Sequence, residues 1–341
     1  MICAGPRGRS SRRALTSRWR GLAALCVVSL ALTACSGSSQ PDPSATPSAP
    51  TSTGSAATPS PGPTANLDAI TVTGAAGKEP TAKASWPVST STTQSKVLTQ
   101  GSGRTVEKTS ILTINYVGVN GRTGKVFDSS FKRGAPATFD LARVVPGFSK
   151  GLTGKKVGDR VLIVTSSADG YDAGGGNPQA GIKVGDSLVF VVDILAVSFP
   201  HAEGTAVTPP SGLPKVTVTD NVPTVTIGDA TRPSSLVVQP LVKGTGPKVK
   251  ASDIIDVRYR TWVWSSGDMI EDGYDAEPVS SPLEGTIEGW KKGLVGQTVG
   301  SRVMLVVPPA MAYPDGTSDP SIAPGQTLVY VIDILFAQSG S

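Results

Sequence analysis

The chain repeats itself once, at a spacing of about 140 residues, and this repeat constrains the fold more than any other feature. The segment Pro146 to Leu152 matches Glu288 to Leu294 at an offset of 142 residues. The segment Leu188 to Leu195 matches Leu328 to Leu335 at an offset of 140. The offset changes only inside loops rich in Gly and Pro. A period of this length indicates two whole domains and not a solenoid of short units.

Each copy is predicted to be mainly β-structure. Residues Ile111 to Val117 alternate apolar and polar side chains, as a half-buried strand does. Arg160 to Thr165 and Ser187 to Val197 are β-branched runs bounded by Gly and Asp. Gly147 to Leu152 is the one good place for a short helix. We therefore expect an α+β fold with two tandem domains, each a curved antiparallel β-sheet wrapped around a short helix.

The repeat also sets the expected domain boundaries. The first domain is predicted at 67–200 and the second, more divergent one at 213–341. Residues 201–212 form a short polar linker that contains proline. Segments 67–96 and 213–237 are expected to add strands at the start of each domain.

The N-terminus has the parts of a secretory signal, predicted to span 1–34. Six arginines with no acidic residue precede an apolar stretch from Leu22 to Leu32, which is shorter than the roughly 20 residues a membrane-spanning helix needs. The next residues complete Leu32-Thr33-Ala34-Cys35, which resembles a bacterial lipobox. That resemblance implies lipidation of Cys35 and a membrane anchor on the extracytoplasmic face of the cell membrane. An ordinary signal peptide with a chance cysteine is the alternative.

Removal of this leader changes the composition of the mature chain. Residues 35–66 are Ser, Thr, Pro, Gly and Ala with almost nothing apolar to bury, which predicts a disordered tether. Cys3 and Cys26 lie inside the leader, so no disulfide or Cys metal site is expected in the folded part. Without the six leader arginines, 25 basic residues meet 26 acidic ones, a net charge of −1. This balance gives no basis for nucleic-acid binding.

The residues offer no conventional active site. His201 is the only histidine and falls in the linker, which excludes Ser-His-Asp and Cys-His triads and multi-histidine zinc sites. The run Gly174 to Gly176 is not followed by a helical pattern, so it is not expected to cradle a phosphate. No metal and no cofactor is predicted.

Several short motifs stand in a fixed order along the first copy. They are Tyr116-Val117-Gly118, then Gly124 to Ser130 with its Phe-Asp-Ser-Ser run, Val145 to Phe148, Tyr171, and Leu188 to Phe190. This set of motifs resembles the FKBP-type peptidyl-prolyl cis/trans isomerases. The resemblance is clear over 97–197 and 238–336. It implies a bacterial lipoprotein with two such domains, each with an apolar pocket between sheet and helix.

The resemblance also implies roles at the matching positions of the first copy. Tyr116, Phe127 and Phe190 would line the walls of the pocket, and Phe148 its floor, where the family usually has Trp. Val144 and Val145 would lead into the helix, with the Val145 N–H holding a substrate carbonyl. Tyr171 would offer its hydroxyl, Asp128 would lie close by, and Ile182 would sit in the loop over the pocket. Ala137 stands at a rim position where the family often has an aromatic residue.

The second copy departs from this pattern. Ile270 and Glu271 replace Phe127 and Asp128, and Tyr330 replaces Phe190. The remaining positions of its pocket are Tyr259, Ile287, Trp290, Tyr313 and Ile322. Catalysis is therefore expected in the first domain, while the second is weakly active or a binding module.

The activity that the resemblance implies needs no acid, base or metal. Isomerisation of an X-Pro bond breaks no σ bond, and its barrier of roughly 20 kcal/mol is lost amide resonance. An apolar pocket stabilises the twisted, less polar amide. The implied partners are proline-containing exported polypeptides and macrolide inhibitors. Two alternatives remain: a non-catalytic chaperone or adaptor that holds proline segments, and a purely structural envelope lipoprotein.

Two further pairs of residues receive no functional role. Asp193 and Asp333 are interpreted as charges at strand edges. Trp262 and Trp264, which have no counterpart in the first copy, form either a partner surface or ordinary packing, and packing is favoured.

Overall fold

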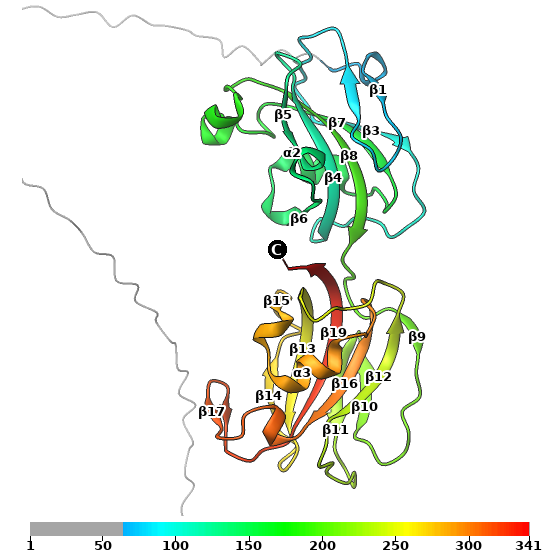
Figure 1. Cartoon of the computed structure of the whole chain (residues 1–341), viewed down its shortest axis with the longest axis vertical. Coiled ribbons are helices and arrows are strands. Elements are labelled where there is room, and N and C mark those ends of the chain that lie inside the picture. Colours follow the sequence, from blue (N-terminus) through cyan, green and yellow to red (C-terminus); the bar gives the residue numbers. More distant parts are fainter. Residues whose placement is uncertain (1–63, 341) are drawn as a thin grey trace, which may run out of the picture. The chain divides into compact units, whose positions relative to one another are not determined.

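The computed structural model describes residues 64–340, and its two largest sheets are antiparallel and related to each other, with few helices (Figure 1). The sheet of domain 1 has the strand order β3-β7-β8-β4-β5, with β6 also paired to β4. Its helices are α1 (Ser130–Arg133) and α2 (Pro146–Leu152). The strands of domain 1 are β1 (Thr71–Thr73), β2 (Thr81–Lys83), β3 (Gln94–Thr99), β4 (Ile111–Asn120), β5 (Val126–Ser129), β6 (Ala137–Asp140), β7 (Arg160–Thr165) and β8 (Leu188–Val197).

Domain 2 repeats this order. Its sheet runs β14-β13-β19-β16-β12-β9, with β15 paired to β13, and its helix is α3 (Glu288–Leu294). The strands of domain 2 are β9 (Gly204–Ala206), β10 (Lys215–Thr219), β11 (Val222–Thr226), β12 (Val237–Gly244), β13 (Asp253–Val263), β14 (Met269–Asp272), β15 (Val279–Pro282), β16 (Arg302–Val307), β17 (Thr317–Ser318), β18 (Ser321–Ile322) and β19 (Leu328–Ser339). Strand β9 lies inside the segment interpreted as linker and pairs with β12.

The central strands are buried on both faces. In β7, Val161 and Ile163 belong to the core around α2, whereas Leu162 and Val164 belong to a second cluster on the opposite face. Alternation along a strand sends neighbouring side chains to opposite faces, so a continuous β-branched run needs cover on both sides. This arrangement explains why 161–164 and 188–192 are unbroken apolar runs.

Helix α2 covers one face at close range. A Cβ atom on Gly151 would lie 2.7 Å from Ile163 Cγ2, so the helix approaches β7 more closely than any larger residue allows. Gly293 repeats this contact in domain 2, where a Cβ would lie 2.6 Å from Leu305 Cδ2. The repeated Gly-Leu pair of the sequence is thus a packing requirement in both domains.

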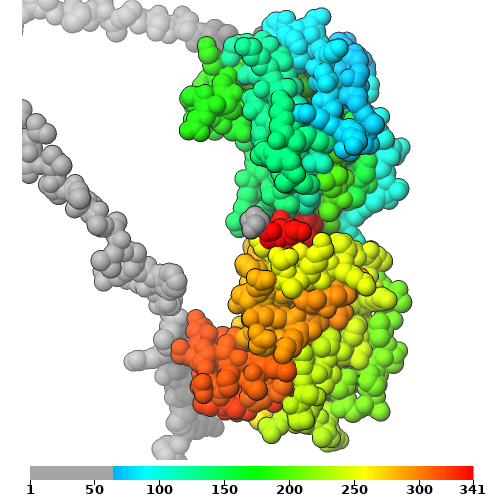
Figure 2. All heavy atoms as spheres, in the orientation of Figure 1, coloured from blue at the N-terminus to red at the C-terminus, as the bar shows by residue number. Residues whose placement is uncertain are grey.

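The N-terminal segments of the two domains cover the opposite face. In domain 1, β1 and β2 form a hairpin, and Ile70, Trp86 and Val88 pack with Leu162 and Val164. Figure 2 shows this segment in blue and cyan on the surface of domain 1. The structure therefore confirms the strands expected within 67–96 and 213–237.

The corresponding hairpin of domain 2 consists of β10 and β11. Its turn is Asp220 and Asn221, both with positive φ, which these two residues tolerate better than most. Val225 from this hairpin packs with Trp262, which is 3% exposed, and Trp264 contacts the same cluster. The favoured interpretation of the two tryptophans as packing residues is confirmed.

A buried ion pair fastens each hairpin to its sheet. In domain 1, Arg160 donates from Nε and Nη2 to Asp193 at 2.6 and 2.7 Å, and from Nη1 and Nη2 to the carbonyls of Gly74 and Lys78. In domain 2, Arg302 binds Asp333 at the same two distances and donates to the Asn221 carbonyl in the hairpin turn. The interpretation of the two aspartates as strand-edge charges is wrong, because both are buried partners of an arginine.

The predicted signal segment, most of the tether and Cys35 lie outside the described residues. Within residues 64–340, no helix has the length and apolar character needed to cross a membrane.

Candidate functional site

Four aromatic rings of domain 1 meet above α2. The Phe148 and Phe190 rings lie 4.6 Å apart between centroids, and Phe127 and Phe190 lie 5.7 Å apart, both edge to face. The Tyr116 ring lies 6.2 Å from that of Phe148. Such edge-to-face pairs stabilise one another beyond their burial alone. We call this group, together with Tyr171, the aromatic site of domain 1.

The site has a buried floor and a more exposed rim. Phe148 and Phe190 are 7% and 3% exposed, while Tyr116, Phe127 and Tyr171 are half-buried. Tyr116 comes from β4, Phe127 from β5, Phe190 from β8 and Phe148 from α2, so the sheet and the helix both contribute. An apolar floor that still touches solvent can receive a small apolar ring such as that of proline.

Asp128 lies at the edge of this site and is held by an arginine. Its carboxylate accepts from the Tyr116 hydroxyl and from Arg133, and Arg133 also donates to the Tyr116 oxygen at 3.2 Å. Burial, followed by the hydrogen bond to Asp128, raises the pKa of Tyr116, so its hydroxyl stays protonated at neutral pH. The carboxylate is therefore neutralised locally by Arg133.

Sequence reasoning did not identify two residues of this site. Arg133 is at the end of α1, which bends the chain after β5 back over Asp128. Phe139 lies 5.8 Å from the Phe148 ring and shares a face of β6 with Ala137. The period of two in a strand was the available signal for Phe139, because residues 137 and 139 must point the same way.

The backbone next to the aromatic floor offers a free donor. Val145 is the residue before α2, and across 64–340 nothing accepts a hydrogen bond from its N–H. The Tyr171 hydroxyl likewise has no partner among the described residues. Both donors can therefore serve a bound carbonyl. Val144 is half-buried and packs on the core, and it also lines an open hollow of about 620 Å³ on the outer side of α2.

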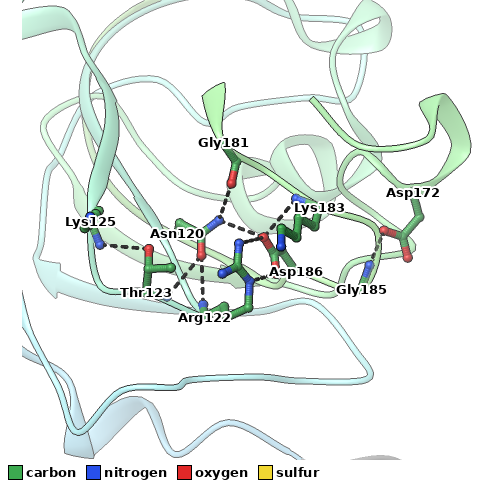
Figure 3. Close-up of polar contacts among 9 residues, drawn as sticks. All are labelled: Asn120, Arg122, Thr123, Lys125, Asp172, Gly181, Lys183, Gly185 and Asp186. Atoms are coloured by element: carbon green, nitrogen blue, oxygen red, sulfur yellow. Dashed lines mark hydrogen bonds and ion pairs between the residues drawn. The ribbon is translucent and has the colours of Figure 1, made fainter. Parts of the chain in front are cut away.

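The loop from Tyr171 to Asp186 is fastened to the turn after β4 (Figure 3). Asp186 accepts from Arg122 Nε at 2.8 Å and from Asn120 Nδ2 at 2.8 Å. Ile182 of this loop is buried and packs in the same core as Phe148. The loop closes on itself by hydrogen bonds in both directions between Ile182 and Asn177. The network thus fixes the loop that carries Tyr171 and Ile182.

The Asp186 network predicts a pH-dependent stability. The hydrogen bond from Arg122 is the main reason that the pKa of Asp186 falls from 3.8 to about 2. A lowered pKa means that the carboxylate stabilises the fold above pH 3.8, and this stabilisation is lost as the pH falls toward 2. We expect the thermal midpoint of domain 1 to drop over this window, and to drop less in Asp186→Asn and Arg122→Met. Calorimetry at a series of pH values measures this, with Lys125→Met as the exposed control. An unchanged pH profile in both variants would contradict the role of Asp186.

Domain 2 brings its predicted residues together in the same way. Trp290 is 7% exposed and packs edge to face with Tyr259 at 4.9 Å and with Tyr330 at 5.6 Å. The other predicted residues, all in or against the same core cluster, are Ile270, Ile287, Tyr313 and Ile322. The Ile287 N–H, like that of Val145, has no acceptor among the described residues. We call this group, with Glu271, the aromatic site of domain 2.

The two sites differ in their carboxylates. Glu271 accepts from the Tyr259 hydroxyl at 3.1 Å and from Thr261 Oγ1 at 2.7 Å. Burial first, and then the charge of Glu271, raises the pKa of Tyr259. No lysine or arginine forms an ion pair with Glu271 within residues 64–340. Domain 2 therefore keeps the aromatic floor but has an unpaired negative charge at its edge.

Comparisons with known proteins match both repeats. A family model described as FKBP-type peptidyl-prolyl cis-trans isomerase matches residues 102–195 and 246–335, together more than half of the chain. The chain is 34% identical over 107 residues to a probable FK506-binding protein of Corynebacterium glutamicum, covering 31% of this chain and 89% of that protein. It is 36% identical over 107 residues to the FK506-binding protein of Streptomyces anulatus, covering 30% of this chain and 86% of that protein.

Among solved structures, a peptidyl-prolyl cis-trans isomerase from Pseudomonas syringae is 28% identical with a TM-score of 0.28. The match covers 30% of this chain and 76% of that chain.

Proposed function

The chain belongs to the FKBP-type peptidyl-prolyl cis-trans isomerase family, and we propose that domain 1 isomerises X-Pro bonds of exported polypeptides. The observation that carries the proposal is the aromatic site of domain 1, in which the Phe127, Phe148 and Phe190 rings meet beside the unpaired Val145 N–H. Relatives named FK506-binding protein support macrolide binding at the same site.

The residues of the site suit this reaction. The proline ring would pack on Phe148 beside Phe127 and Phe190, and this apolar contact excludes water from the amide. The twisted amide has a less polar carbonyl than the planar one, so an apolar surround stabilises it relative to water. The Val145 N–H would hold the carbonyl of the neighbouring residue, and the Tyr171 hydroxyl would donate to the peptide backbone. The pair Asp128 and Arg133 would hold Tyr116 in its wall position.

An isomerase assay on a proline-containing peptide tests the proposal. The full chain is expected to accelerate cis/trans interconversion, and a macrolide of the FK506 class is expected to block it. A folded chain without acceleration would contradict the catalytic role. It would favour the alternative, a chaperone or adaptor that binds proline segments without isomerising them.

Domain 2 supports a second function on different evidence. Ile270 replaces the wall ring Phe127, and no arginine of residues 64–340 pairs with Glu271 as Arg133 does with Asp128. The floor formed by Trp290 is nevertheless intact. Domain 2 is accordingly proposed to bind proline segments and to contribute little to turnover.

The proposed location is the extracytoplasmic face of the cell membrane, with a lipid on Cys35. Its support is the sequence alone, namely the basic leader and Leu32-Thr33-Ala34-Cys35. We expect Cys35→Ala to move the protein from the membrane fraction to the soluble fraction and to abolish labelling by a fatty-acid analogue. Fractionation and labelling of both forms measure this. Labelling that persists in Cys35→Ala would contradict lipidation at this residue.

A further inference from the structure

The carboxylates Asp128 and Glu271 occupy equivalent positions in the two aromatic sites, but within residues 64–340 only Asp128 is paired with a cation. In domain 1, Arg133 contacts both Asp128 and the Tyr116 oxygen, and its guanidinium lies 5.3 Å from the centre of the Tyr116 ring. In domain 2, the donors to Glu271 are two neutral hydroxyls, those of Tyr259 and Thr261. The site of domain 1 has its own cation, whereas Glu271 of domain 2 has hydrogen bonds but no counter-ion among the described residues.

This difference in pairing follows from the segment after β5 in domain 1 and the segment between β14 and β15 in domain 2. Domain 1 inserts α1 after β5, and its last residue is Arg133. Domain 2 has no helix between β14 and β15, and the connecting residues 273–278 include Asp275 and Glu277 but no lysine or arginine. The segment after β14 therefore supplies no cationic side chain to Glu271.

Three cations of domain 2 form ion pairs with carboxylates other than Glu271. Arg260 lies between Tyr259 and Thr261 on β13, so its side chain points to the opposite face of the strand. There it donates from Nε to Asp272 at 2.8 Å. Arg302 is buried against Asp333, and Lys291 pairs with Glu288 at 2.9 Å. None of the three forms an ion pair with Glu271.

The aromatic residues of domain 2 also favour a bound cation. Trp290 and Tyr330 occupy the positions of Phe148 and Phe190, and Trp and Tyr attract a cation more strongly than Phe. Burial, with the charge of Glu271 as a further cause, raises the pKa of Tyr259, Tyr313 and Tyr330. No cation is among the causes of these three shifts, whereas Arg133 opposes the shift of Tyr116 in domain 1.

We propose that domain 2 selects proline segments with a lysine or arginine next to the proline, and that Glu271 supplies this selectivity. The inference rests on the proposed function of domain 2 as a proline-binding site. A cationic side chain would occupy the place that Arg133 fills in domain 1, between a carboxylate and a tyrosine ring. Domain 1, whose carboxylate is already neutralised, gains nothing from a cation at this position.

Fluorine NMR on the full chain tests the proposal directly. The chain has 5 tryptophans, and the 5-fluorotryptophan signal of Trp290 is assigned by its loss in Trp290→Phe. Since the floor of domain 1 is Phe148, this signal reports binding at domain 2 alone. The ligands are the capped peptides Ala-Lys-Pro-Phe, Ala-Leu-Pro-Phe and Ala-Glu-Pro-Phe.

The lysine peptide is expected to bind about five- to tenfold more tightly than the leucine peptide, and the glutamate peptide most weakly. Glu271→Gln should remove this preference, while the exposed control Glu284→Gln should keep it. In domain 1, Arg133→Gln should create a preference for lysine in kcat/KM of the isomerase assay. This reciprocal variant tests the same idea if Glu271→Gln fails to fold.

Two results overturn the inference, and they are distinguishable. Equal affinity for the lysine and leucine peptides, unchanged in Glu271→Gln, overturns the selectivity and leaves proline binding in place. No response of the Trp290 signal to any peptide, while domain 1 stays active, overturns both the selectivity and the proposed binding role of domain 2.

Discussion

Phe127→Ala is expected to lower kcat/KM for a proline peptide by roughly 10- to 100-fold. The Phe127 ring lies edge to face on Phe190 and forms one wall of the aromatic site of domain 1. Contact with an apolar side chain of this size stabilises a bound group by about 1.5–3 kcal/mol. Each 1.36 kcal/mol or so of transition-state stabilisation corresponds to about a factor of ten in rate. The isomerase assay described above measures the change.

Two matched variants make this result specific. Phe131→Ala removes a ring of the same kind from the opposite face of the sheet, so activity should be retained. Ile270→Ala alters the corresponding position of domain 2 and should leave most of the turnover intact. A fully active and folded Phe127→Ala protein would remove the assignment of catalysis to domain 1, and a large loss in Ile270→Ala would transfer it to domain 2.

The second large effect concerns stability. Arg160→Met is expected to destabilise domain 1 by about 3–5 kcal/mol, because it leaves the carboxylate of Asp193 buried without its counter-ion. The carbonyls of Gly74 and Lys78 lose their donor in the same variant, so the β1–β2 hairpin should loosen first. Calorimetry should show the thermal midpoint of domain 1 lowered by at least roughly 10 °C.

A surface pair provides the control for this prediction. Lys96 and Asp68 form an ion pair in which the side chains are 47% and 79% exposed, and such pairs contribute about 0–1 kcal/mol. Lys96→Met should therefore have little effect. The double variant Arg160→Met with Asp193→Leu should recover part of the loss, since no buried charge remains. Equal effects of Arg160→Met and Lys96→Met would contradict the fastening role of the buried pair.

Much of the domain architecture could be predicted because it depends on local periodicity. The offset between Gly151 and Gly293 revealed two related domains, and the family model matches both of them. The alternation in Ile111 to Val117 predicted β4, which extends three residues further to Asn120. The short helix expected at 147–152 begins one residue earlier, at Pro146. Periodicity reports which side chains share a face, and this is enough to place strands and helices.

Periodicity could not predict which residues pair with the charged side chains. Arg160 and Asp193 recur in the second copy as Arg302 and Asp333, so the repeat marked them without revealing their contact. Arg160 binds the carbonyl of Gly74, which is 86 positions away in the chain. A hydrogen bond over that separation depends on how the hairpin packs on the sheet, and no local pattern encodes it.

The order of residues predicts two repeated β-rich domains and the aromatic residues that gather in each, because burial of alternate side chains gives the sequence a period. Whether a cation pairs with the carboxylate of each site depends on the tertiary structure. It shows that α1 turns Arg133 onto Asp128, while the chain after β14 leaves Glu271 with two hydroxyls. Electrostatic pairing depends on distances through space, and those distances are set when the connecting segments fold over the sheet.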